Sequence, residues 1–242
     1  MTSLQELKLQ AAQAALPYIK SGMRLGLGSG TTAEEFVKLL GSEVSNGSIK
    51  DLACVPTSSR TAELASSLRL NLVTLEDCPD LDLLVDGADE IDDHLNMIKG
   101  GGGALLREKI VASRSRNVLI IADDTKLVSC LGLFPVPIEV VSFGLGVTCT
   151  AIRRVFEDFN LSGRLVLREY RTGQALITDE GHYIVDASLT KIDRDLDSLS
   201  LALTGIPGVV EHGLFVNTAT LAIIVGEKGV YRLSRQDGKL DF

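Results

Sequence analysis

Four consecutive glycines occupy positions 100–103, between a lysine and a segment with helical spacing. Glycine loses more conformational freedom on folding than any other residue, so such a run indicates a backbone that must come close to something. Lys99 precedes the glycines, and Glu108 lies about one turn into the helix predicted over 104–115. A carboxylate could move a proton here, and the cation and loop N–H groups could stabilise an oxyanion.

Glu108 is flanked by apolar positions on the predicted helix: Val111 on one side, Leu105 and Ala112 on the other. Apolar surroundings raise the pKa of a carboxyl group, as a general base working near neutral pH requires. The alternative is an ordinary helix glutamate paired with a nearby lysine or arginine, and spacing alone does not decide between them. A nucleotide-binding P-loop is excluded, because its lysine must follow the glycines and Lys99 precedes them.

An acidic turn, DGADEIDD, begins at Asp86 directly after the strand predicted over 81–85. Asp86 and Asp89 flank Gly87 and Ala88, two small residues that allow close backbone approach. The carboxylates could accept hydrogen bonds from sugar hydroxyls or move protons. Metal ligation is a second interpretation, although the spacing does not fit an EF-hand loop. A solvated acidic turn is a third.

The turn at 28–33 reads GSGTTA and opens a predicted helix. Backbone N–H groups and the helix dipole favour an anion there, and Ser29, Thr31 and Thr32 add hydroxyl donors. A dinucleotide site would need an acidic residue after the next strand, which ends in VPTSSR. The pattern therefore favours the phosphate of a sugar over a dinucleotide. The alternatives are an NADP-dependent reductase, with Arg60 on the 2′-phosphate, and a plain capped turn.

A fourth strand end is followed by ADDTKLV at 122–128, where Lys126 could reach the same crevice or be a solvated loop lysine. In a doubly wound sheet, ligands bind outside the carboxyl ends of the strands, so the four segments are expected to meet.

Composition limits the possible partners. The net charge is −8 and the basic residues form no stripe, so nucleic acid is not expected as a partner. No apolar run approaches the roughly 20 residues that span a bilayer, and the N-terminus lacks a signal-peptide core. The four cysteines are far apart, which favours a reduced, cytoplasmic setting, and the histidines lack the spacing of a zinc site.

The elements of the first half alternate between helix and apolar strand, which predicts an α/β fold with a mostly parallel, doubly wound sheet. Helices are predicted over 4–20, 33–40, 59–68 and 104–115, and strands over 23–28, 51–55, 70–75, 81–85 and 117–122. Gly41 is expected to stop the second helix.

The pattern changes to α+β after 134–141, where Pro135 and Pro137 predict an edge strand or a connector. The further elements predicted are a helix at about 147–159, a strand at 164–170, a hairpin at 175–187 turning near Gly181, a helix at 195–204, a strand at 208–216 and a hairpin at 221–233. The last hairpin could return to the first sheet. We therefore expect a Rossmann-like domain over 1–132 plus 213–242 and a small α+β domain over 133–212.

These segments, in this order, resemble the type A ribose-5-phosphate isomerases. The resemblance runs from the first helix to the tail and includes KGGGGALLREK, ADDTKLV, FPVPIEV and GIPGVVEHGLF. It implies interconversion of D-ribose 5-phosphate and D-ribulose 5-phosphate through an enediolate, in the pentose phosphate pathway, without metal or cofactor. It also implies a ferredoxin-like small domain, expected in the contacts of a homodimer or homotetramer. The one departure is a turn reading GSGTT where the family often has GTGST or GSGST.

The resemblance also implies roles for individual residues. Glu108 matches the proton acceptor, and Lys99, Asp86 and Asp89 belong to segments that match the substrate-binding loops. As further catalytic residues, we expect Lys99 to stabilise the enediolate oxygen, and Asp86 and Asp89 to bind hydroxyls and help open the furanose ring. Residues matching the substrate-binding positions are Ser29, Gly30, Thr31, Thr32, Gly87, Ala88, Gly100, Gly101, Gly102, Lys126 and Lys8. A sugar-phosphate-sensing regulator on the same fold is the non-enzyme alternative. It would usually carry a DNA-binding segment, which this acidic chain does not show.

Overall fold

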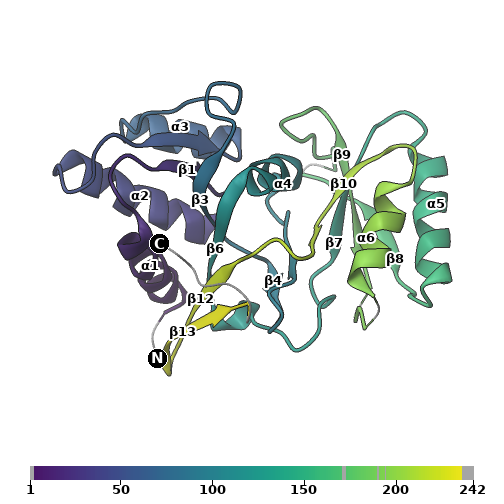
Figure 1. Cartoon of the computed structure of the whole chain (residues 1–242). Helices are drawn as coiled ribbons and strands as arrows, with labels where there is room; N and C mark the ends of the chain where they lie inside the picture. Colours follow the sequence, from purple (N-terminus) through teal and green to yellow (C-terminus); the bar gives the residue numbers. More distant parts are fainter. Residues whose placement is uncertain (1–2, 171–172, 190, 194, 236–242) are drawn as a thin grey trace.

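The computed structural model describes residues 3–170, 173–189, 191–193 and 195–235, and places two main sheets side by side (Figure 1). The larger sheet has six strands in the order β13-β12-β6-β3-β1-β2. Their bounds are β1 Arg24–Leu27, β2 Ala53–Pro56, β3 Leu81–Asp86, β6 Ser115–Asp123, β12 Leu221–Gly226 and β13 Gly229–Ser234. All neighbours are parallel except β12 and β13, so the tail hairpin returns to the first sheet as predicted.

Helices cover both faces of this sheet. They are α1 Leu4–Ala15, followed by the short 3-10 helix η1 Leu16–Tyr18, then α2 Thr31–Ser45, α3 Ser59–Ser67 and α4 Leu105–Ser113. Successive strand residues point to opposite faces, so Leu83 and Val85 pack in the core beneath α1 and α2. Leu84 packs on the other face with Leu105 and Val111 of α4. The doubly wound α/β architecture is therefore confirmed.

Two local predictions in this domain are wrong. Gly41 does not stop α2, which continues to Ser45. The glycine instead allows a close contact, because a Cβ atom there would lie 2.9 Å from the Cβ of Leu68. Residues 70–75 make a single bridge, between Leu72 and Cys54, rather than a strand. The chain then turns at Thr74, whose hydroxyl bonds to Asp77, so the ladder does not continue.

The second sheet has four antiparallel strands in the order β10-β7-β9-β8. Their bounds are β7 Val136–Val140, β8 Arg164–Leu167, β9 Tyr183–Ser188 and β10 Val209–His212, with the helices α5 Leu145–Asp158 and α6 Leu196–Thr204. Ile152 and Phe156 of α5 and Leu199 and Leu203 of α6 pack against the sheet in a core of their own. The smaller α+β unit is present, while the exact domain boundaries remain a prediction.

The structure corrects two expectations about the small sheet. β7 is an interior strand, not an edge or connector, although it contains Pro137. The proline ring fits because a glycine faces it: a Cβ at Gly213 would lie 2.6 Å from the Cδ of Pro137. Of the hairpin predicted at 175–187, the turn at Gly181 and the strand β9 form, but residues 176–182 form no strand.

Residues 208–216 form two strands instead of the one predicted. β10 ends at His212, and after Gly213 the chain enters a separate three-stranded sheet, β11-β5-β4. Its strands are β4 Glu90–Ile91, β5 Met97–Ile98 and β11 Leu214–Phe215. The Gly213 carbonyl accepts from the N–H of Lys99 at 2.9 Å. This unpredicted sheet therefore fixes the second half of the acidic turn through β4, and leads through β5 directly into the glycines.

Candidate active site

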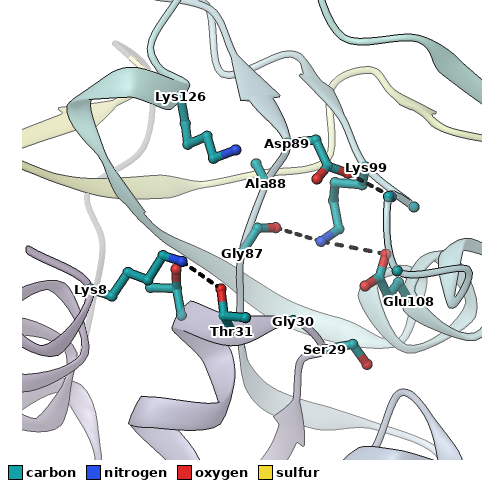
Figure 2. Close-up of a pocket in the computed structure, with 14 residues that line it drawn as sticks. Lys8, Ser29, Gly30, Thr31, Gly87, Ala88, Asp89, Lys99, Glu108 and Lys126 are labelled. Atoms are coloured by element: carbon teal, nitrogen blue, oxygen red, sulfur yellow. Dashed lines mark hydrogen bonds and ion pairs between the residues drawn. The ribbon is translucent and has the colours of Figure 1, made fainter. Parts of the chain in front are cut away.

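A cavity of about 130 Å³ opens where β1, β3 and the glycine run come together (Figure 2). Its lining residues are Lys8, Ser29, Gly30, Thr31, Thr32, Gly87, Ala88, Asp89, Lys99, Gly100, Gly101, Gly102, Glu108 and Lys126. The fold thus brings together, around one cavity, every residue that the sequence singled out for catalysis or binding except Asp86, which lies behind the wall.

Lys99 is the centre of the buried end of the cavity. Its side chain is only 4% exposed, and its ammonium lies 3.0 Å from Asp86 Oδ2 and 3.5 Å from Glu108 Oε2. It also donates to the carbonyl oxygen of Gly87 (Figure 2) and lies 5.6 Å from the ring centre of Phe215. The three donors of the ammonium group are therefore shared among three oxygens, of which Glu108 holds the most distant.

Asp86 is fully buried and serves as an anchor for the surrounding backbone. Its Oδ1 accepts hydrogen bonds from the N–H of Gly87 at 2.7 Å and of Ser29 at 3.1 Å. A side chain at Gly28 would overlap this carboxylate, which explains the glycine there. Asp86 thus links the turn at 28–33 to the acidic turn, and its ion pair with Lys99 holds the lysine in place from outside the cavity.

Glu108 lies in the first turn of α4, among the apolar residues that the helical wheel predicts, and is 5% exposed. Burial raises its pKa to about 8, outweighing the attraction of Lys99, with the negative charges of Asp86 and Asp89 adding to the effect. Among the described residues, its carboxylate makes an ion pair with Lys99 and accepts no hydrogen bond. It is thus free to accept a proton from a ligand.

The charges of this buried group do not balance, because one cation faces two carboxylates. Burial opposes the charge of Lys99, but Asp86 and Glu108 outweigh it and raise its pKa to about 12. Burial also raises the pKa of Asp86, against the opposing effect of Lys99 and two backbone donors. Asp86 accepts two backbone hydrogen bonds and Glu108 accepts none among the described residues, so Glu108 is the carboxylate of this pair that is better placed to take up a proton.

The other end of the cavity is suited to an anion. Lys8 Nζ donates to Thr31 Oγ1 at 2.8 Å, and Lys126 lies at the same end of the cavity, on the side away from Lys99 and Glu108 (Figure 2). Helix α2 begins at Thr31 without a side-chain cap, after Gly30 with φ +93°. Its first N–H groups therefore remain available to a phosphate.

Three hydroxyl residues that the sequence analysis did not select support this turn. The Ser29 hydroxyl lies 2.7 Å from Thr57 Oγ1, 2.9 Å from Ser58 Oγ and 3.2 Å from Thr61 Oγ1. Thr61 also donates to the Gly28 carbonyl. In this structure the Ser29 hydroxyl is directed to that cluster. The sequence signal for these residues is the run TSSRT directly after β2, in which four of the five side chains carry a hydroxyl group.

Two alternatives receive no support from the site. Arg60, which a reductase would place on a 2′-phosphate, pairs with Glu34 at 2.7 Å and is absent from the cavity lining. For metal ligation, the described residues contain no group of three or more histidines, cysteines, aspartates or glutamates that could hold an ion.

Residues 53–229 match the family model of ribose 5-phosphate isomerase A (phosphoriboisomerase A). The chain belongs to the ribose 5-phosphate isomerase A family. It is 52% identical to "Ribose-5-phosphate isomerase A" of Sinorhizobium fredii, covering 95% of this chain and 98% of the relative. The protein of the same name from Brucella suis is 53% identical, covering 97% of this chain and 100% of the relative.

Solved structures agree with this assignment. Ribose 5-phosphate isomerase from Plasmodium falciparum superposes with a TM-score of 0.89 at 38% identity, covering 98% of this chain and all of that one. Ribose 5-phosphate isomerase A from Methanocaldococcus jannaschii gives a TM-score of 0.88 at 35% identity, over 96% of this chain and all of the other. The chain is therefore an isomerase that interconverts ribose 5-phosphate and ribulose 5-phosphate in the pentose phosphate pathway.

Proposed function

We propose that the cavity binds open-chain ribose 5-phosphate with its phosphate at the turn 29–32 and its C1–C2 end at Glu108. The separation of the two kinds of group supports this orientation. Lys8, Lys126 and the open end of α2 lie on one side of the cavity, and Lys99 and Glu108 on the other (Figure 2). A phosphate and a carbonyl at opposite ends of a five-carbon chain fit that division.

Glu108 carries the proton in this proposal. It removes the proton on C2, which gives an enediolate, and returns a proton to C1, which gives the ketose. The hydroxyl proton moves correspondingly from O2 to O1. The supporting observation is a buried carboxylate with a pKa raised to about 8 and no hydrogen bond among the described residues. Such a group is basic enough to accept a carbon-bound proton and acidic enough to return it.

Lys99 stabilises the oxyanion in the proposed mechanism. The contact to Glu108, at 3.5 Å, is longer than the one to Asp86, at 3.0 Å. A substrate oxygen can therefore replace Glu108 on the ammonium, while Asp86 and Gly87 hold the lysine in place. The exchange stabilises the developing negative charge and at the same time frees the base.

Asp86 and Asp89 take different roles. Asp89 lines the cavity and can bind hydroxyls and assist opening of the furanose ring, whereas Asp86 is fully buried and acts through Lys99. A related isomerase structure, 38% identical with a TM-score of 0.88 over 96% of this chain and all of that one, is in complex with phospho-erythronic acid. That ligand combines a phosphate with a carboxylate, the charge pattern that the two ends of this cavity accommodate.

The test is to treat the enzyme with a chelator, add ribose 5-phosphate and measure ketose formation. We expect undiminished product. Absence of product without chelator would overturn the activity, and loss only with chelator would make Asp86 and Asp89 metal ligands.

The setting of the enzyme is also part of the proposal. None of the described helices is long and apolar enough to cross a membrane. We propose a cytoplasmic homodimer or homotetramer with contacts through the small domain at 133–212. The surface near α5 and α6 supports this, since Phe143, Val147 and Leu201 are 91%, 78% and 75% exposed.

A further inference from the structure

Arg168 belongs to the small domain, and its side chain contacts the glycine run that lines the cavity. It follows β8 directly, and its backbone N–H donates to the carbonyl of Ile184 at 2.8 Å. Its guanidinium Nη1 donates to the carbonyls of Gly100 at 2.8 Å and Gly101 at 3.1 Å. The glycine run that lines the cavity is therefore bound from behind by a residue to which the sequence analysis gave no role.

Asp186 of β9 holds Arg168 in a fixed orientation. Arg168 Nε lies 2.8 Å from Asp186 Oδ2, and Nη2 lies 2.5 Å from Oδ1. The two side chains are 13% and 22% exposed, so the pair is largely shielded from solvent. A bidentate arginine–carboxylate pair fixes the plane of the guanidinium, which then offers its remaining donor in one direction.

The peptide between Gly100 and Gly101 is held from both ends. Its carbonyl oxygen accepts from Arg168, and its N–H donates to Asp89 Oδ2 at 2.7 Å. The two groups of a trans peptide point in opposite directions, so these contacts set its orientation. In the next peptide, the Gly101 carbonyl also accepts from Arg168, so the N–H of Gly102 points away from Arg168. That N–H has no acceptor among the described residues.

We propose that Arg168, fixed by Asp186, is a positioning residue for the isomerisation. It holds two carbonyls of the glycine run away from the substrate, so that the N–H of Gly102 faces the reacting end of the sugar and donates to the enediolate oxygen. The small domain thereby takes part in catalysis without touching the substrate. The inference rests on the proposed function, because it needs the C1–C2 end of the sugar to lie at this end of the cavity.

The test compares Arg168→Gln with Arg24→Gln. Arg24 makes a similar bidentate pair with Asp82, at 2.7 and 3.2 Å, but at the amino ends of β1 and β3, away from the cavity. We expect Arg168→Gln to lower kcat by about 10–100-fold, since a displacement of about 1 Å can cost that much. Competitive inhibition by inorganic phosphate, which tests the turn at 29–32, should be unchanged. Arg24→Gln should keep the parental kcat.

A second pair of variants guards against misfolding. Asp186→Asn keeps Arg168 but weakens the bidentate pair that orients it, and should lower kcat less than Arg168→Gln does. Arg168→Lys keeps the positive charge but not the planar guanidinium, and should not restore kcat. Parental kcat in a folded Arg168→Gln enzyme would overturn the inference. So would an equal loss of phosphate affinity, or an equal loss in Arg24→Gln. A parental enzyme that forms no ketose would instead overturn the proposed function.

Discussion

A carboxylate works as a base near neutral pH only if its surroundings raise its affinity for a proton, and at Glu108 burial does this. The helical wheel already places Glu108 among apolar residues, so this feature was predictable from sequence. The partners of the carboxylate were not. The approach of Lys99 to within 3.5 Å depends on β5 and on the Gly213 contact, and neither produces a sequence pattern.

Replacing Glu108 by glutamine should lower kcat by about 10²–10⁴-fold with little change in KM, because the substitution removes the base and keeps the shape. In the parent, kcat/KM should fall as the pH drops below about 8, since protonation inactivates the base. Steady-state kinetics across pH 5–10 measures both effects. Glu108→Asp, which keeps a carboxylate, is the control and should retain the acidic limb. Near-normal turnover of Glu108→Gln would refute the assignment.

At the scale of the elements, the four glycines at 100–103 are needed for different structural reasons. Gly100 and Gly103 have φ of +100° and +87°, and a Cβ at Gly101 would lie 2.6 Å from an oxygen of Asp89. The φ angle of Gly102 lies outside the left-handed region, and a Cβ there would meet nothing within 4 Å. The fold therefore accounts for three of the four glycines, and the proposed substrate contact would account for the fourth.

Gly102→Ala should therefore fold with parental stability and raise KM for ribose 5-phosphate by about tenfold or more, because its methyl group occupies the cavity. Gly103→Ala, with its positive φ, is the matched variant and should lower the melting temperature. Thermal unfolding and steady-state kinetics separate the two effects. An unchanged KM in Gly102→Ala would show that the substrate does not approach this position.

The sequence predicted an element correctly where a hydrophobic pattern extended over several residues. It failed where a single tertiary contact determined the local structure. The apolar strands at 81–85 and 117–122 were found because parallel strands covered on both faces are apolar throughout. The interior position of β7 was missed because a proline normally confines a strand to the edge of a sheet. Here Gly213, which has no side chain, leaves room for the ring of Pro137. The split of 208–216 at that glycine was missed because the apolar residues before Glu211 and those after Gly213 both favour a strand.

At the scale of the whole molecule, a buried polar cluster joins α4 to the small sheet. Lys109 Nζ donates to Glu211 Oε1 at 2.7 Å and to the carbonyls of His212 and Leu214. Leu214 N–H donates to His212 Nδ1, so that nitrogen carries no proton. Burial and then the charge of Lys109 lower the pKa of His212 to about 4, with Glu211 opposing them. Histidine is therefore neutral at this junction.

This cluster should make the protein sensitive to acid. Between pH 6.5 and 4 the unfolded chain binds a proton at His212 that the folded chain does not, so the free energy of unfolding falls with the pH, by up to about 3 kcal/mol at pH 4. His212→Asn should reduce the difference in stability between pH 7 and pH 5. Urea unfolding at both pH values measures it, and an unchanged difference would contradict the assignment.

The order of the strands has a consequence for biosynthesis. β12 lies between β6 and β13, yet β6 ends at Asp123 and β12 begins at Leu221, with the whole small domain in between. A ribosome adding about 5–20 residues per second needs about 5–20 seconds to cover that stretch. Throughout this interval the apolar edge of β6 in the nascent chain is uncovered. We therefore expect the growing polypeptide to depend on chaperones most strongly in the second half of its translation.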